Sequence, residues 1–151
     1  MKPPGYSSVT PSLTVADGAA ALEFYTRALD ATELCRMPDP RSGKIMHAEF
    51  QIGDSRLMLA DESPDCGNTA PAVGKGGLFM IYLADVDTAF AKAVAAGATA
   101  LSEPADQFWG DRSGCIADPF GYRWMLATHV RDVPPEEMAK AAAEWSPNKE
   151  G

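Results

Sequence analysis

Residues 56–60 read Arg-Leu-Met-Leu-Ala, and residues 123–127 read Arg-Trp-Met-Leu-Ala, at a shift of 67 positions. The same shift brings further identical residues together: Ala28 with Ala95, Ala31 with Ala98, Thr32 with Thr99, and Leu34 with Leu101. A shift of 68 matches Ala16, Asp17 and Ala21 with Ala84, Asp85 and Ala89, so one residue was gained or lost inside the intervening helix. Self-similarity at a fixed spacing is typical of a repeated structural unit. The sequence therefore predicts that one module has been duplicated.

Each copy predicts one strand, one helix and then three strands. Alternating polar and apolar residues indicate the strands, and apolar residues at helical spacing indicate the helices. In the first copy the strands are expected at 8–15, 32–37, 45–52 and 55–60, and Asp17 caps a helix at about 18–29. In the second copy they are expected at 78–83, 99–102, 112–117 and 123–129, and Asp85 caps a helix at about 86–96. The predicted fold class is α+β, with two βαβββ modules in tandem.

The two modules cover about 8–60 and 78–129 of a single domain that we expect to span residues 1–151. Residues 61–77, rich in Gly and Pro, form the predicted linker between them. A short C-terminal helix is predicted at about 134–145 because two prolines open it. Its apolar stripe is expected to dock on the rest of the domain and comprises Met138, Ala141, Ala142 and Trp145. Residues 146–151 are expected to form a frayed tail.

The charge balance is acidic, with 13 Lys and Arg against 21 Asp and Glu and a net charge of −8. It argues against nucleic-acid and anionic-membrane partners, because no basic patch would contact phosphates. The N-terminus lacks the apolar run of a signal peptide, and no apolar stretch reaches the roughly 18 residues of a membrane span. Cys35, Cys66 and Cys115 form neither an even disulfide set nor a CxxC spacing, and the first and last are expected in the core. We therefore expect a cytoplasmic protein.

Two βαβββ modules in tandem, with Asp118-Pro119-Phe120-Gly121-Tyr122 before the final strand, resemble the vicinal-oxygen-chelate superfamily. This superfamily contains glyoxalases, bleomycin resistance proteins and extradiol dioxygenases. Segments 45–50, 57–62, 106–112 and 134–138 are similar to its PhnB-like branch. The resemblance implies a cupped, mostly antiparallel eight-stranded sheet with the helices outside. It also implies a small-molecule ligand in the cup and a homodimer.

The catalytic members of this superfamily hold a metal ion through one inward residue on the first and last strand of each module. The repeat places Thr10, Met58, Leu78 and Met125 at these positions. None of them offers an imidazole or a carboxylate, and a thioether is a poor ligand for Mg, Mn, Ni or Zn. We therefore expect no metal at this site and no cofactor.

The same alignment predicts which side chains face the cup. Gly53-Asp54 suits a type II′ hairpin, which pairs Glu49 with Met58 and turns His47 to the same side. The lining would mix apolar groups with a few polar ones, as small-molecule sites do. The predicted ligand-binding residues are Thr10, Ser12, Gln51, Arg56, Met58, Leu78, Met80, Tyr82, Gln107, Trp109, Arg112, Arg123 and Met125. The alternative is that this face of the strands simply meets water.

His47 and Glu49 lie two residues apart on one predicted strand, so their side chains are neighbours on one face. The carboxylate would raise the basicity of the imidazole, which suits a general base or a pair that orients a ligand. A purely structural hydrogen-bonded pair is the alternative. A relocated metal site is the third option, but it would need a further ligand, and the second histidine of the chain, His129, ends the last strand.

The loop at 107–112 precedes the seventh strand, where superfamily members often contact ligand. Trp109 would cover the cup and stack on a planar group, and Arg112 would hold a carboxylate or phosphonate. Alternatively, the loop packs on its own module, and Asp111 and Arg112 form a surface ion pair. Residues 118–121 are interpreted as a turn only.

Two functions remain open. The first is a metal-independent small-molecule-binding protein of the glyoxalase/bleomycin resistance type, which holds a polar or aromatic ligand in the cup. The second is an enzyme, a lyase or isomerase that moves a proton on a small carbonyl or anionic substrate with His47 and Glu49. The first is favoured because nothing in the sequence activates a nucleophile or supplies an electrophilic catalyst.

Overall fold

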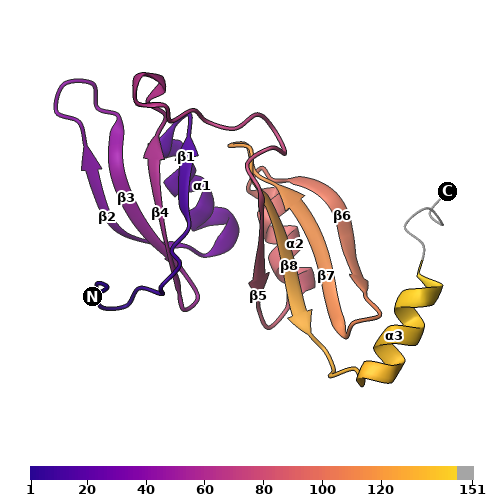
Figure 1. Ribbon diagram of the computed structural model, residues 1–151. Helices are drawn as coiled ribbons and strands as arrows, with labels where there is room; N and C mark the ends of the chain where they lie inside the picture. Colours follow the sequence, from indigo (N-terminus) through magenta and orange to yellow (C-terminus); the bar gives the residue numbers. More distant parts are fainter. Residues whose placement is uncertain (146–151) are drawn as a thin grey trace.

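The computed structural model describes residues 1–145, in which eight strands form two four-stranded sheets (Figure 1). The tail expected at 146–151 lies outside the described residues. The first sheet has the spatial order β1 (Ser12–Val15), β4 (Ser55–Asp61), β3 (Ile45–Ile52), β2 (Thr32–Pro38). The second sheet has the spatial order β5 (Leu78–Tyr82), β8 (Arg123–His129), β7 (Asp111–Ala117), β6 (Thr99–Asp106). In each sheet the first pair is parallel and the other two pairs are antiparallel.

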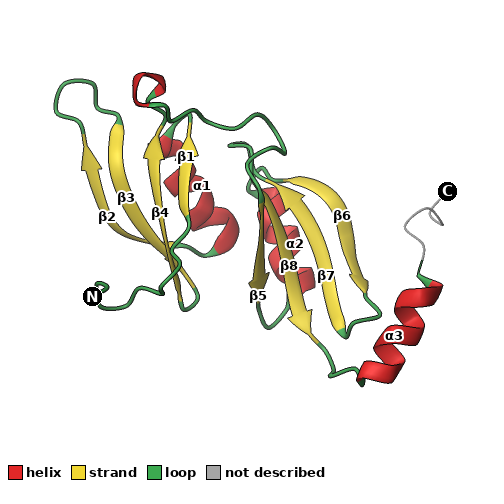
Figure 2. Cartoon of the chain, in the orientation of Figure 1, coloured by secondary structure: helices red, strands yellow, loops and turns green. Residues whose placement is uncertain are grey.

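Each sheet carries one long helix on one side (Figure 2). The helices are α1 (Gly18–Leu29), α2 (Val86–Ala95), the short 3-10 helix η1 (Pro64–Cys66) and the C-terminal α3 (Pro135–Glu144). The carboxylates of Asp17 and Asp85 accept hydrogen bonds from the backbone N–H groups of Ala20 and Thr88, at 3.0 and 3.1 Å. Both predicted caps are thereby confirmed. The predicted α+β architecture, with two βαβββ modules and a C-terminal helix, is also confirmed.

The strand registers repeat with the spacing found in the sequence. Ser12 lies opposite Met58 in the β1–β4 pair, and Met80 lies opposite Met125 in the β5–β8 pair. Ser12 and Met80 are 68 positions apart, whereas Met58 and Met125 are 67 positions apart. The two copies therefore superpose strand for strand, with the change of one residue between their first and fourth strands.

Both modules contribute to one hydrophobic core. Alternate strand residues such as Phe50 and Trp124 are buried against Tyr25 of α1 and Phe90 of α2, and the two helices also pack on each other. Burial of this apolar surface is the main force that holds the sheets together. Within residues 1–145 no helix covers the opposite face of either sheet, and we call these two surfaces the open faces.

Two strands differ in length from the prediction. β1 begins at Ser12 instead of residue 8, so the residues before it join no strand. β6 continues through Pro104 to Asp106 instead of ending at residue 102, because register shifts between Ala100 and Ala105 let the strand bend and resume its pairing with β7.

The C-terminal helix and the cysteines also correct the sequence interpretation. None of the residues of α3 is fully buried and Trp145 is 56% exposed, but its ring centroid lies 6.2 Å from that of Phe108, so the predicted stripe contacts the second module only at its edge. Cys35 is exposed and Cys115 is half-buried, so neither is a fully buried core residue. None of the helices in residues 1–145 has the length and apolar character needed to cross a bilayer.

Candidate functional site

The open face of the first sheet carries the polar side chains of β3 and β4. Along β3 and β4 half-buried residues alternate with fully buried ones, and the half-buried set includes His47, Glu49, Gln51, Arg56 and Met58. Glu49 pairs with Met58 across the two strands. Gly53 has a φ of +55° at the hairpin, as the first central position of a type II′ turn requires. The predicted register and orientation are confirmed.

His47 and Glu49 form the titratable pair expected on this face. His47 Nε2 lies 3.1 Å from Glu49 Oε1, and the side chains are 38% and 24% exposed. The neighbouring hydroxyl of Tyr6 and then the imidazole of His47 lower the pKa of Glu49. Glu49 is therefore held as a carboxylate that accepts hydrogen bonds.

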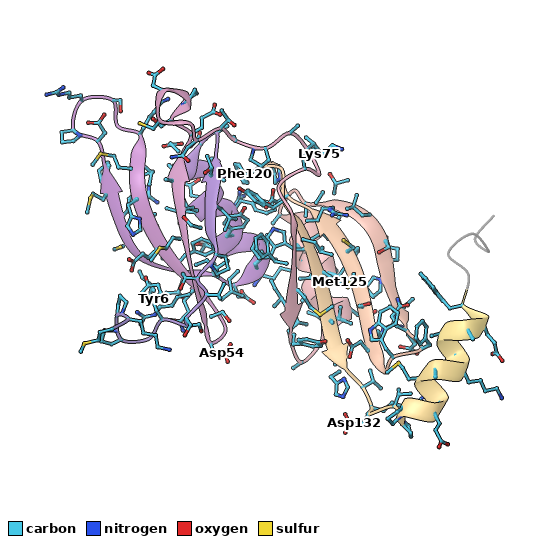
Figure 3. All side chains as sticks on the ribbon, in the orientation of Figure 1. Tyr6, Asp54, Lys75, Phe120, Met125 and Asp132 are labelled. Atoms are coloured by element: carbon cyan, nitrogen blue, oxygen red, sulfur yellow. The ribbon has the colours of Figure 1, made fainter. Side chains whose placement is uncertain are left out.

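Tyr6 belongs to this face although no sequence pattern indicated it. Figure 3 shows Tyr6 near the lower ends of the strands of the first sheet. Its side chain is 8% exposed, and the Arg56 guanidinium carbon lies 5.2 Å from its ring centroid, within the range of a cation–π contact. Burial, followed by the nearby Glu49 carboxylate, raises the pKa of the phenol. The hydroxyl nevertheless makes no well-formed hydrogen bond to any described residue.

The open face of the second sheet is more apolar. Leu78, Met80 and Tyr82 of β5 are 47%, 45% and 60% exposed. Met125 lies beside Met80 in the sheet. Arg123, also on this face, makes no ion pair within residues 1–145, and its Nε atom is buried without a hydrogen-bond partner. The Arg123 Nε–H is therefore an unsatisfied buried donor within residues 1–145.

A buried carboxylate organises the far end of the second face. Asp111 is 4% exposed and accepts hydrogen bonds from the Tyr82 hydroxyl at 3.1 Å and from Trp109 Nε1 at 3.2 Å. Its other oxygen lies 2.8 Å from His129 Nδ1, and His129 Nε2 lies 2.7 Å from Asp132. The indole N–H of Trp109 is therefore already bound within its own module.

Arg112 and Gln107 do not join the other predicted residues. Arg112 points to the helix-bearing side, where it donates to both oxygens of Asp87 at 2.8 Å and to Asp106 at 3.3 Å. Its expected partner in the alternative interpretation was Asp111, which instead binds His129. The Gln107 amide donates to the Ala105 carbonyl at 3.4 Å. These two residues therefore do not belong to the site.

The residues at the superfamily's metal positions do not fit a metal ion. Thr10 lies before β1 and its hydroxyl donates to the Ser7 carbonyl at 3.2 Å, while Met58, Leu78 and Met125 offer thioether or aliphatic groups. His47 lies on the first sheet and His129 on the second, each bound to carboxylates. In the described part of the chain no three His, Cys, Asp or Glu residues converge as a metal site would need.

A cleft of about 540 Å³ lies where the two modules meet. One wall comes from the N-terminal segment and the β3–β4 hairpin, and the other from β5 and Trp124. Of the predicted ligand-binding residues, this cleft brings together Arg56, Met80 and Tyr82. The cleft also contains Ser7, Val9, Pro11, Phe79 and Ile81, which no sequence pattern indicated as ligand-binding. Thr10, Ser12, Gln51, Met58, Leu78, Trp109, Arg123 and Met125, like His47 and Glu49, lie outside its lining.

Comparison with known proteins identifies a family and several relatives of this chain. Residues 7–126 match the family described as the Glyoxalase/Bleomycin resistance protein/Dioxygenase superfamily. An uncharacterised protein of Mycobacterium bovis is 42% identical over 139 residues, which cover 89% of this chain and 91% of the relative. An uncharacterised protein of Arabidopsis thaliana is 30% identical over 114 residues, which cover 71% of this chain and 69% of the relative.

Solved structures share the same fold. TioX from Micromonospora sp. ML1 is 26% identical with a TM-score of 0.65, and the match covers 82% of this chain and 99% of that chain. A glyoxalase/bleomycin resistance protein/dioxygenase from Nocardioides is 25% identical with a TM-score of 0.65 and 89% coverage of both chains. The PhnB protein from Bacillus cereus, at 20% identity and a TM-score of 0.61, shows the fold alone over 81% of this chain and 99% of that chain.

Proposed function

The chain belongs to the glyoxalase/bleomycin resistance protein/dioxygenase superfamily, and from this premise we propose that it binds a small polar or aromatic molecule without a metal ion. The observation that supports this most is the cleft between the modules. Its volume of about 540 Å³ falls within the roughly 300–1,000 Å³ of small-molecule sites. Its walls combine apolar and polar surface in similar amounts, so a ligand would meet both packing surface and hydrogen-bonding groups such as Asp54 and Arg56.

The lining favours a planar ligand with a hydrogen-bond acceptor. Phe79 lies in the wall and offers aromatic surface, with the buried Trp124 behind it, and Met80 adds an adaptable thioether. Arg56 supplies a guanidinium, whose planar fork suits a carboxylate or another flat acceptor. The absence of imidazole and carboxylate groups at Met58, Leu78 and Met125 is the chemical reason to propose binding without a metal.

The test uses benzoate, 4-hydroxybenzoate and indole as probes, with binding followed by thermal shift and by amide NMR. Met80→Trp is expected to fill the cleft and to weaken the tightest probe at least tenfold. Met46→Trp is the matched control, since Met46 is 53% exposed and lies outside the cleft. Treatment with EDTA should leave binding unchanged. The proposal is wrong if no probe perturbs the cleft amides, or if EDTA abolishes binding.

The His47–Glu49 pair supports a second candidate, an enzyme that moves a proton on a small carbonyl or anionic substrate. At 3.1 Å the two side chains are within reach of each other, and both are accessible from the open face. The proton would pass from substrate to imidazole, with Glu49 orienting the ring. His47→Gln should then abolish turnover while it preserves binding of the tightest probe, and equal turnover by both proteins would exclude this role.

We also propose that the chain acts as a homodimer in the cytoplasm. The half-exposed Leu78, Met80 and Tyr82 form an apolar strip that a second copy would cover, and the three cysteines are free, as in a reducing compartment. Sedimentation equilibrium should give twice the mass of one chain, and Leu78→Glu, at a position outside the cleft lining, should reduce it to the mass of one chain. Cell fractionation tests the compartment.

A further inference from the structure

A single side chain attaches the N-terminal segment, residues 3–7, to the open face of the first sheet. Tyr6 is buried, whereas the residues on either side of it are exposed. The segment also makes three hydrogen bonds: Arg56 Nη1 donates to the Pro4 carbonyl at 3.2 Å, Tyr6 N–H donates to Pro3 at 3.3 Å, and the Thr10 hydroxyl donates to the Ser7 carbonyl at 3.2 Å. The segment pairs with no strand, so its position depends on the seating of one ring.

That ring fits its place by shape but not by hydrogen bonding. Arg56 covers one side of the phenol, and the hydroxyl faces Glu49 without completing a hydrogen bond. A buried hydroxyl without a partner is unfavourable, because it has given up its water. The unsatisfied group is the Tyr6 hydroxyl beside Glu49, and a free phenol, which is not tied to the chain, can align its hydroxyl with that carboxylate better than Tyr6 does.

The backbone next to Tyr6 is shaped to cover Arg56. Gly5 has a φ of +82°, and a Cβ atom there would lie 2.6 Å from Arg56 Cζ. A glycine is needed for both the left-handed conformation and the close approach. Substitution at Gly5 would strain the backbone and push the Arg56 guanidinium aside, so it would loosen the contacts that hold the segment.

The segment also separates the cleft from the titratable pair. Ser7 of this segment lines the cleft, and Arg56 contacts both the cleft and the Tyr6 ring. His47 and Glu49 lie outside the cleft lining. Departure of Tyr6 would join these two spaces, with Arg56 between them.

We propose that Tyr6 is the internal occupant of a binding subsite for a small phenol, whose ring replaces Tyr6 against Arg56 and whose hydroxyl donates to Glu49. The incoming ligand displaces residues 3–7, and the cleft then extends to His47. This inference deepens the proposed function and rests on it, because it names the chemical class of ligand and the segment that competes with it.

The probe is p-cresol, which reproduces the tyrosine side chain. If the segment competes for the subsite, its removal raises the apparent affinity by the inverse of the fraction of open molecules. Tyr6→Ala should bind p-cresol at least tenfold more tightly than the unmodified chain, and Tyr6→Phe, which keeps the ring, should not. Gly5→Ala should also bind more tightly, and it serves as the second variant if Tyr6→Ala does not fold. Glu49→Gln in the Tyr6→Ala chain should weaken binding.

The decisive measurement is made on the unmodified chain. At saturating p-cresol the amide signals of Gly5 and Tyr6 should move to unstructured positions, because the segment has left. A tyrosine that is only structural would let cresol fill the Tyr6→Ala cavity but would leave Gly5 unmoved in the unmodified chain, and that result overturns the inference. Failure of the cleft proposal would instead appear as equal probe binding by Met80→Trp and Met46→Trp, with the Gly5 response intact.

Discussion

The hydroxyl of Tyr25 in α1 donates a 2.6 Å hydrogen bond to Asp118, which lies in the turn between β7 and β8 of the other module. Asp118 is 3% exposed, and the same oxygen accepts a hydrogen bond from Trp124 Nε1 at 2.8 Å. Its second oxygen accepts the backbone N–H groups of Phe120 and Tyr122 at 2.8 and 3.0 Å. Burial and the adjacent carboxylate raise the pKa of Tyr25 far above its usual range. This carboxylate is fully bonded and joins the two modules.

Replacement of Asp118 by Ala should destabilise the chain by about 3 kcal/mol, because the tyrosine, the indole and two amides lose their buried acceptor. Tyr25→Phe, which leaves the other donors in place, should cost about 1 kcal/mol. Urea denaturation monitored by tryptophan fluorescence measures both values. Asp65→Ala, at an exposed position of η1, is the control and should stay within about 0.5 kcal/mol. A loss at Asp118 no larger than at Asp65 would contradict this role.

The parts of the fold that local sequence patterns encode were predictable. Alternation of side chains specifies which face of β3 and β4 carries His47 and Glu49, and the internal repeat by itself aligns Met58 with Met125. The two helix caps follow from an aspartate at the right distance from the first apolar residues.

Contacts between distant residues were not predictable. Asp118 lies in a stretch whose sequence is typical of a turn, and its hydrogen-bond partner Tyr25 lies 93 positions away. Tyr6 precedes the repeat, so it has no counterpart in the second copy, and its burial depends on Arg56, which lies 50 positions further along the chain. The stripe on α3 shows an amphipathic helix, but periodicity cannot say which surface such a stripe meets.

Gly114 is predicted to be intolerant of any side chain. It lies in the interior of β7, opposite Leu126, and an added Cβ would be 2.9 Å from both Pro104 N and Ser102 O. Those atoms belong to the backbone of β6 and cannot rotate away. Gly114→Ala should therefore cost about 2 kcal/mol of unfolding free energy, measured by urea denaturation. Ala105→Ser, on the exposed part of β6, should cost less than about 0.5 kcal/mol, and equal effects would argue against the close approach.

The Arg123 guanidinium is predicted to add nothing to the stability of the fold. Its buried Nε lacks a partner, so Arg123→Met, which keeps the stem and removes the unsatisfied donor, should be neutral or stabilising by about 1 kcal/mol. Arg112→Met is the matched control, because it removes the hydrogen bonds to Asp87 and Asp106 and should cost about 0.5 kcal/mol. Thermal and urea denaturation show which of the two substitutions destabilises the chain more. Greater destabilisation at Arg123 would mean that its guanidinium has a structural partner.

The last prediction concerns His129, whose two ring nitrogens each face a carboxylate. Asp111 and then Asp132 raise the pKa of the imidazole, because both favour its protonated form. Asp111 also accepts hydrogen bonds from the Tyr82 hydroxyl and the Trp109 indole N–H. His129 is therefore part of a hydrogen-bond network at the end of the second sheet. A raised pKa in the folded state means that the stabilisation is complete below the unfolded value of about 6.5, and that it disappears as the pH rises through the folded value.

The unfolding free energy should accordingly fall between about pH 6.5 and the raised pKa of His129. His129→Gln should remove this part of the pH dependence, whereas His47→Gln, which leaves His129 intact, should retain it. The measurement is the urea midpoint from pH 5.5 to 8.5, paired with an NMR titration of the His129 ring. If the unfolding free energy of His129→Gln falls by the same amount over this pH range, another titratable group causes the effect. An NMR pKa at or below the unfolded value would mean that the two carboxylates do not hold the imidazolium in solution.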